Sequence, residues 1–318
     1  MKNSTLIVIL VYICTACSNT TSTRVTEIPT QASSPVATSV STQTHIPVNS
    51  STPSQAPTVT LEMGAWKSML VIPVGVSPRV ADIFKQGLAI GRDPARFSKI
   101  GDCQNITPYF LSAFDDPSKY HLGSQYDYLQ QTIEHFKGSW SRPSLATHGG
   151  YNAATVLSSF WTLVPRPDAC EKGETPVACE IRVYNPSFAI ISMEEAWSGD
   201  IQKYDHYLRM LVDYVLSEDV VPIIATRAEI PGSQDTINET VAQIAYDYDI
   251  PLWNFGAATV VLPNYGLISS DGFHLTPGTV EGNYNFDDPI RMELGWTWRN
   301  LTALQTIDSV YQFLITHP

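Results

Sequence analysis

The chain has 318 residues, and 43% of them are apolar, which is ample for a packed core that needs no metal to hold it together. Its formal net charge is −12, and no cluster of Lys or Arg offsets this negative charge locally. An acidic chain of this kind repels a phosphate backbone, so we expect no nucleic acid partner.

The N-terminus is typical of an export signal. Lys2 precedes an apolar run at 6–13 that is too short to span a membrane but has the length of a signal-peptide core. Small residues then lead to Cys17 in a Cys-Thr-Ala-Cys sequence that resembles the bacterial lipobox, although Cys14 stands where Leu is usual. We therefore expect residues 1–17 to be a signal peptide and Cys17 to carry a lipid that anchors the protein to the outer face of the cell membrane. An ordinary secretory signal and an uncleaved anchor are the alternatives.

Residues 18–61 consist mainly of Ser, Thr, Pro, Val and Gln, with almost no aromatic residue. Such a segment cannot bury enough apolar surface to order itself, so we predict a disordered tether. No repeat and no second change of composition divides residues 62–318, which we interpret as one domain.

From residue 62 onward, short β-rich runs alternate with amphipathic stretches of helical spacing. This alternation is typical of a parallel α/β sheet. We predict strands at 97–100, 144–147, 188–191, 220–225 and 251–255, and helices at 125–136, 204–215, 237–245 and 301–313. The run at 188–191 is apolar throughout, as in a strand that is buried on both faces.

Two of the five cysteines, Cys170 and Cys179, lie nine residues apart in a segment that contains Gly and Pro. In an exported protein this arrangement favours a disulfide that would pin the loop before the strand at 188–191. Two independent thiols are the alternative.

Three separated segments carry the residues that could perform chemistry. They are Ile-Gly-Asp-Cys at 100–103, Gly-Gly-Tyr-Asn at 149–152 and Asp-Gly-Phe-His-Leu-Thr at 271–276. Their order and their contexts resemble the motifs of the SGNH (GDSL-like) hydrolases, over roughly residues 95–315. Four further segments, at 170–179, 186–187, 251–254 and 299–304, look like those of a bacterial lipoprotein-like branch of that family.

The resemblance implies a three-layer α/β/α fold with a flavodoxin-like parallel sheet, and an ester hydrolase that needs no cofactor or metal. Cys103 stands at the position of the nucleophile, His274 at that of the base, and Asp271 at that of the carboxylate that orients the base. The backbone N–H groups of Cys103 and Gly150 would form the oxyanion hole, with Gly149 as the alternative to Gly150. The implied ligand is a small acyl ester or a glycan, for example a polysaccharide that carries acetyl groups.

The family signature is altered at two places. Cys103 replaces the serine; a thiolate next to a histidine can still attack an acyl carbon, but sulfur is larger and sits differently relative to the oxyanion donors. Ala196 stands where the family has an asparagine, and the loss of one oxyanion donor costs about 10²- to 10³-fold in rate. Asn152 is a candidate replacement donor.

Charged residues flank the same positions. Glu194 replaces the glycine of the family's turn, and with Glu195 it places negative charge where an anion should develop. We expect these two to be a solvated pair that turns away from the site. Asp102 is expected to organise its turn through backbone hydrogen bonds.

Three functions are compatible with these residues. The first is an ester hydrolase that works through Cys103, His274 and Asp271. The second is a surface protein that binds a glycan and has lost turnover, in which Cys103 is a buried or unpaired thiol and His274 is structural. The third, a purely structural or adhesive lipoprotein, leaves the Asp-x-x-His sequence unexplained.

Overall fold

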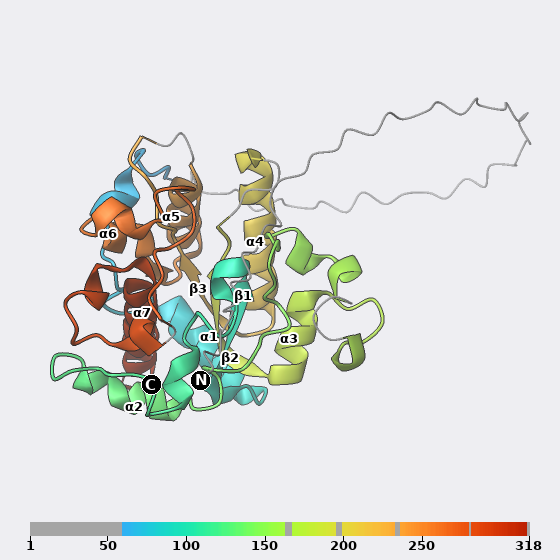
Figure 1. Cartoon of the computed structure of the whole chain (residues 1–318). Coiled ribbons are helices and arrows are strands. Elements are labelled where there is room, and N and C mark those ends of the chain that lie inside the picture. The colour runs from blue at the N-terminus through green and yellow to red at the C-terminus, as the bar shows by residue number, and fades with distance from the viewer. Residues whose placement is uncertain (1–58, 163–166, 195–198, 233–235, 280, 317–318) are drawn as a thin grey trace, which may run out of the picture. The chain divides into compact units, whose positions relative to one another are not determined.

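A parallel sheet is the centre of the computed structural model, which describes residues 59–162, 167–194, 199–232, 236–279 and 281–316 (Figure 1). Within them the sheet has four strands in the order β1-β2-β3-β4. They are β1 (Asp93–Gly101), β2 (Pro186–Ser192), β3 (Val221–Ala225) and β4 (Leu252–Trp253). The predicted signal peptide with Cys17, and the tether as far as residue 58, lie outside the described residues.

The strand predictions at 97–100, 188–191 and 220–225 are confirmed. Phe97 pairs with Phe188 across β1 and β2, and Ile190 pairs with Ile223 across β2 and β3. The strand predicted at 251–255 is only two residues long, because Asn254 caps a short helix, α6 (Phe255–Thr259), and ends the strand there.

The prediction of a strand at 144–147 is wrong except at its last residue. Thr147 forms an isolated parallel bridge with Gly101. The residues before it use their backbone N–H groups elsewhere: that of Leu145 donates to the Glu180 carboxylate at 2.8 Å, and that of Ala146 to the Ser144 hydroxyl at 3.0 Å. Of these two donors, the N–H of Ala146 is the one that faces β1, because the carbonyl oxygen of Ala146 accepts from the N–H of Gly101.

The Thr147 bridge is short, but it indicates where the candidate site lies in the sheet. It occupies the position of a further strand at the edge of β1 that faces away from β2. After β1 the chain therefore first passes to this edge and then crosses back to the other side of β1, where β2 lies. In open parallel sheets, ligands bind beyond the carboxyl ends of the strands at such a reversal of strand order. This reversal places the carboxyl ends of β1 and β2 at the candidate site.

Seven α-helices are present in the described residues. They are α1 (Pro78–Ala89), α2 (Gln130–His135), α3 (Pro176–Tyr184), α4 (Ile201–Ser217), α5 (Ile237–Tyr248), α6 and α7 (Gly295–Thr316). The helices predicted at 204–215, 237–245 and 301–313 are confirmed. The helix predicted at 125–136 is shorter, because its first part is a 3-10 turn at Asp127–Leu129.

Three helices, α1, α3 and α6, were not predicted, and the first two share a start signal. Both begin with a hydroxyl cap followed by proline: Ser77 accepts from the backbone N–H of Val80, and Thr175 from that of Ala178. A capping residue followed by Pro at the first helical position is a start signal that a sequence can show.

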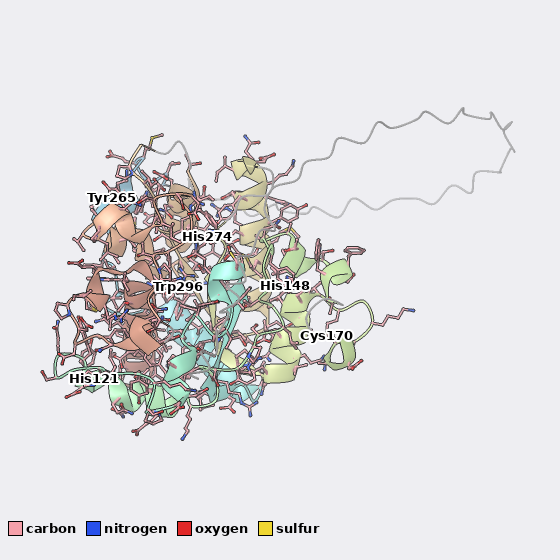
Figure 2. All side chains as sticks on the ribbon, viewed as in Figure 1. His121, His148, Cys170, Tyr265, His274 and Trp296 are labelled. Atoms are coloured by element: carbon pink, nitrogen blue, oxygen red, sulfur yellow. A yellow bond between two sulfur atoms is a disulfide. The ribbon has the colours of Figure 1, made fainter. Side chains whose placement is uncertain are left out.

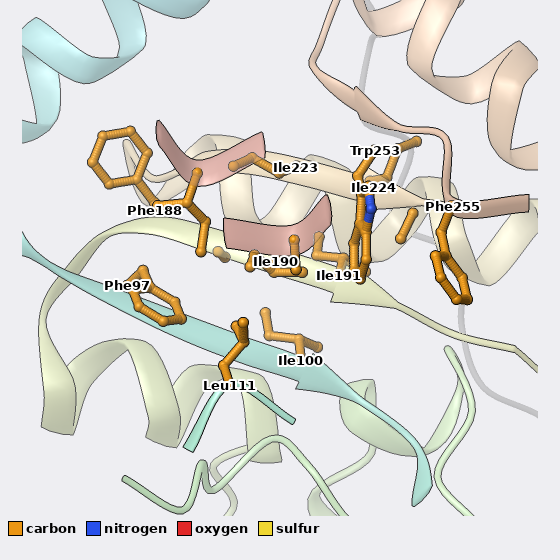
Figure 3. Packing of buried hydrophobic residues seen from close by; sticks show 14 of the residues in the cluster. Phe97, Ile100, Leu111, Phe188, Ile190, Ile191, Ile223, Ile224, Trp253 and Phe255 are labelled. Atoms are coloured by element: carbon orange, nitrogen blue, oxygen red, sulfur yellow. The ribbon is translucent and has the colours of Figure 1, made fainter. Parts of the chain in front are cut away.

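Helices cover both faces of the sheet. Every residue of β2 and of β3 is buried, which is possible only for strands covered above and below. The strands lie between α7 and α4 in Figure 1, and α4 packs on α5 while α2 packs on α7. Figure 3 shows the apolar side chains of the strands, among them Phe97, Ile190 and Ile223, packed within this core. The expected α/β fold with a parallel sheet is confirmed.

Among the described helices, none combines the length and the apolar character that crossing a membrane requires.

The disulfide between Cys170 and Cys179 is present. It joins the loop before α3 to α3 itself, in which Cys179 is fully buried. The bridge therefore fixes this loop to a helix that precedes β2.

We expect the bridge to contribute about 2.5 kcal/mol to stability, because it closes a loop with a sequence separation of 9 residues in the unfolded chain. Replacing Cys170 and Cys179 together by Ala should lower the free energy of unfolding by about that amount, measured by urea denaturation. Dithiothreitol should destabilise the unaltered protein and leave the double variant unchanged. An unaltered midpoint in the double variant would contradict a stabilising role.

Candidate active site

The turn after β1 is built around a glycine and an aspartate. A Cβ at Gly101 would lie 2.1 Å from Nδ2 of Asn105 and 2.5 Å from the carbonyl oxygen of Ser192, so only glycine fits between β1 and β2 here. The next residue, Asp102, is buried; its Oδ1 accepts from the backbone N–H of Gln104 at 3.1 Å, and its Oδ2 from that of Glu194 at 2.7 Å. Asp102 thus ties the turns after β1 and β2 together, in agreement with its predicted role.

Cys103 begins the 3-10 turn Cys103–Asn105 directly after this aspartate. It is not disulfide-bonded and is partly exposed, so the alternative of a buried thiol does not hold. The side chain of Asn105 fixes the turn from the other end, because its Nδ2 donates to the Ser192 carbonyl at 2.9 Å. Both ends of the turn that carries Cys103 are therefore anchored to the end of β2.

The Asp-x-x-His sequence forms a second turn. The Asp271 Oδ1 accepts from the backbone N–H groups of Phe273 and His274, each at 2.9 Å, and its Oδ2 lies 3.0 Å from Nδ1 of His274. Burial of Asp271 acts in the opposite direction, but these donors together hold the pKa of its carboxyl below its ordinary value. The carboxylate thus stays ionised and engages Nδ1, which leaves Nε2 of the ring as the basic nitrogen.

The orientation of His274 has a second support. Its carbonyl oxygen accepts from the backbone N–H of Ile268 at 2.8 Å, and Leu275 forms an antiparallel bridge with Leu267. The ring itself is about half exposed, since 48% of the side chain is accessible. Within the described residues, no hydrogen bond engages its Nε2, so this nitrogen is available to a substrate or to a neighbouring thiol.

A direct contact joins the Cys103 turn to the His274 turn. Gln104, which follows Cys103, donates through Nε2 to the carbonyl oxygen of Phe273, which precedes His274, at 3.3 Å. Arg227 links Phe273 to the turn after β2: its Nη1 donates to the Glu194 carbonyl at 2.7 Å, and its guanidinium lies 5.8 Å from the centre of the Phe273 ring. Two segments about 170 positions apart in the chain thus lie side by side at the carboxyl edge of the sheet.

The expectation that Glu194 belongs to a solvated pair is wrong. Glu194 is 3% exposed, and its Oε1 lies 2.9 Å from Nη1 of Arg299, a residue of α7 that is itself fully buried. The sequence interpretation missed this because a buried partner on a distant helix is invisible in a local pattern. The charge of Glu194 is therefore paired and does not oppose an oxyanion by itself.

Arg299 also holds the Cys103 turn against the end of β2. Its Nη2 donates to Oδ1 of Asn105 at 3.1 Å and to the hydroxyl of Ser192 at 3.0 Å, and its Nε donates to the carbonyl oxygen of Gln104 at 3.3 Å. Three aromatic rings surround the guanidinium, with centroids between 4.9 and 5.3 Å away, those of Phe110, Trp253 and Phe255. No sequence signal identified this residue as part of the site.

Asp102 has an unusual acidity in this environment. Burial, followed by the nearby charge of Glu194, raises its pKa from 3.8 to about 7, against the opposing effect of the backbone donors and of Arg299. An aspartate with a raised pKa is protonated in the folded chain at pH values where it is ionised in the unfolded chain. Stability from this group is therefore present below pH 4 and decreases as the pH rises toward 7.

We expect the replacement Asp102→Asn to flatten the dependence of stability on pH between about 4 and 7, by a change on the order of 3 kcal/mol. Urea denaturation at several pH values, compared with the unaltered protein, measures the slope. Asp116→Asn is the matched control, because that carboxyl lies at an exposed turn and its pKa is lowered by the Ser118 hydroxyl. Parallel curves for the Asp102 variant and the unaltered protein would exclude the raised pKa.

The segment that contains Gly149 and Gly150 directly follows the Thr147 bridge and so lies at the carboxyl edge of the sheet. The backbone N–H of His148 donates to the Gly101 carbonyl at 3.3 Å, and Gly150 follows with a positive φ of 83°. His148 and His274 both lie at this end of the sheet in Figure 2. Asn152 is engaged in its own turn, since its Oδ1 accepts from the backbone N–H groups of Ala154 and Thr155.

Two of the predicted positions, Glu195 and Ala196, lie outside the described residues. In the described part of the chain, one group of residues has ligand atoms close enough together to hold a metal: Cys170, Glu174 and Cys179. Since its two sulfur atoms are bonded to each other, this group is a disulfide and not a metal site.

No protein-family model and no curated protein matches the chain. Among solved structures, the chain is similar to a GDSL-like lipase from Bacteroides thetaiotaomicron VPI-5482, with 12% sequence identity and a TM-score of 0.36, over 72% of this chain and 98% of the lipase. So distant a similarity supports no conclusion about activity, and the α/β assignment rests on the sheet and helices themselves.

Proposed function

We propose that this protein is an SGNH-like hydrolase of ester bonds in which Cys103 is the nucleophile. The observation that carries the proposal is the contact between Gln104 and Phe273, because it brings the Cys103 turn beside the Asp271–His274 pair. A partly exposed thiol, a histidine oriented by a carboxylate and a position at the reversal of strand order support the same conclusion.

In this mechanism Nε2 of His274 takes the proton of the Cys103 thiol, and the thiolate adds to the ester carbonyl carbon. The backbone N–H groups of Cys103 and Gly150 donate to the oxyanion that forms. When the C–O bond breaks, the protonated His274 gives its proton to the leaving alcohol, and a thioester remains. Water, deprotonated by His274, then cleaves the thioester, which releases the carboxylic acid and restores the thiol.

A second candidate is a protein of the same fold that binds a glycan without turning it over. It is favoured by the chain's Ala196, which has no side-chain donor for an oxyanion where the related hydrolases carry asparagine. In both cases we propose an exported protein, anchored through a lipid on Cys17 or secreted.

Hydrolysis of p-nitrophenyl acetate separates the two candidates. Turnover that Cys103→Ala abolishes supports the enzyme, and folded protein without turnover above background supports the binding protein. In the latter case, activity that appears in the combined variant Cys103→Ser with Ala196→Asn would identify the chain as an esterase whose site has decayed.

A further inference from the structure

Gln104, the residue directly after Cys103, is held at its backbone and buried at its side chain. Its backbone N–H donates to Oδ1 of Asp102 at 3.1 Å, and its carbonyl oxygen accepts from Nε of Arg299 at 3.3 Å. Only 2% of Gln104 is exposed. The side chain therefore starts from a rigid backbone and is packed on all sides.

The amide of Gln104 reaches the peptide group that leads into His274. Its Nε2 donates to the carbonyl oxygen of Phe273 at 3.3 Å, and the N–H of the same peptide group, that of His274, donates to Oδ1 of Asp271 at 2.9 Å. The carbonyl oxygen and the N–H of a trans peptide point in opposite directions, and the Cα of His274 lies in their plane. Gln104 and Asp271 together therefore fix the point from which the imidazole extends.

The other polar atom of the amide has no partner. Within the described residues, Oε1 of Gln104 is buried and accepts no hydrogen bond. A buried acceptor without a donor lowers stability, whereas an apolar side chain of similar shape carries no such penalty. Phe273 is only partly buried, so its carbonyl oxygen can bind water where no amide reaches it. Stability alone thus favours an apolar residue at position 104, and the amide is explained by what Nε2 binds.

We propose that Gln104 is a positioning residue, which sets the distance between the Cys103 thiol and the His274 imidazole through the carbonyl oxygen of Phe273. The thiol and the base must lie within hydrogen-bond reach for the proton to pass between them, and a misplacement of about 1 Å can cost about 10²-fold in rate. The amide therefore trades some stability for a fixed geometry at the site. This inference rests on the proposed function.

The variant Gln104→Met tests this trade, because it keeps the size of the side chain and removes both amide atoms. We expect its midpoint of urea denaturation to be equal to or above that of the unaltered protein, while kcat for p-nitrophenyl acetate falls about 10- to 100-fold. Gln104→Leu should give the same pattern, and it takes the place of Gln104→Met if that variant does not fold.

Gln243→Met is the matched control. The Gln243 amide also joins two segments, since its Oε1 accepts from the backbone N–H of Leu61 at 2.7 Å and its Nε2 donates to Asp247 at 2.7 Å. These partners belong to neither the Cys103 turn nor the His274 turn. Gln243→Met should therefore lower stability and leave kcat within about twofold.

The reactivity of the thiol tests the positioning without a substrate. An imidazole nearby favours the thiolate, so alkylation of Cys103 by iodoacetamide at pH 7 should be about tenfold slower in Gln104→Met than in the unaltered protein. In the background of His274→Ala the imidazole is gone, and Gln104→Met should have no further effect. Mass spectrometry of the peptide that contains Cys103 measures these rates.

Stability and kcat that fall together in Gln104→Met would show a purely structural role and overturn the inference. Unchanged kcat and unchanged alkylation would overturn it as well, and so would slower alkylation that persists in the background of His274→Ala. If no form of the protein hydrolyses p-nitrophenyl acetate, the proposed function fails. The alkylation rates then still decide whether Gln104 positions His274 against Cys103.

Discussion

Replacing Cys103 or His274 by Ala should lower kcat for p-nitrophenyl acetate by about 10³-fold or more, because the two side chains act as one nucleophile and base. The two losses should not add in the double variant, since either one alone already disables the proton transfer and the attack. Steady-state assays of the two single variants and the double variant measure this, with thermal unfolding to show that each is folded. Asp271→Asn should also lower kcat. The amide does not hold the neutral His274 ring in the tautomer that carries its proton on Nδ1 and leaves Nε2 free to act as the base.

A chemical control distinguishes the Cys103 thiol from a contaminating esterase. Iodoacetamide should inactivate the unaltered protein and leave any activity of Cys103→Ser untouched, since Cys170 and Cys179 are bonded to each other. Activity that survives both alkylation and the Cys103→Ala replacement would rule out the proposed nucleophile.

Breaking the buried pair of Glu194 and Arg299 should have the largest effect on stability. The replacement Arg299→Met keeps most of the side-chain volume among the aromatic rings but leaves the Glu194 carboxylate buried without a counter-charge. Loss of one partner of a buried pair typically costs about 3–5 kcal/mol. We expect a decrease of that size in the free energy of unfolding, measured by urea denaturation.

The double variant Glu194→Leu with Arg299→Met separates the charge from the packing. Two apolar residues of similar size leave no uncompensated charge, so much of the lost stability should return. The double variant still lacks the hydrogen bonds from Arg299 to Asn105 and to Gln104, which hold the Cys103 turn. We therefore expect its kcat to be lower than that of the unaltered protein even if the double variant is stable. Full recovery of kcat together with stability would show that Arg299 does not position the Cys103 turn.

The elements that could be predicted from the sequence are those whose signal is local. The run at 188–191 is apolar at every position because β2 is covered on both faces, and the spacing of Tyr204, Leu208 and Val215 matches the buried side of α4. The strand predicted at 144–147 is absent because the Ser144 hydroxyl accepts from the backbone N–H of Ala146, the donor that faces β1 in the register of the Gly101–Thr147 bridge. The Thr147 hydroxyl in turn donates to the Lys99 carbonyl that this donor would have reached, and such side-chain competition is not part of strand propensity.

The residues of the candidate site also comprise some with a local sequence signal and some without one. Asp271 and His274 are three residues apart and Asp102 caps the turn that follows it, so these interactions are local and could be predicted from the sequence. The other contacts of the site could not be predicted, because burial and charge pairing depend on which distant elements pack nearby. Glu194 is buried because α7 brings Arg299 against it, and a cavity beside Gly150 is formed between α4 and the segment 150–161.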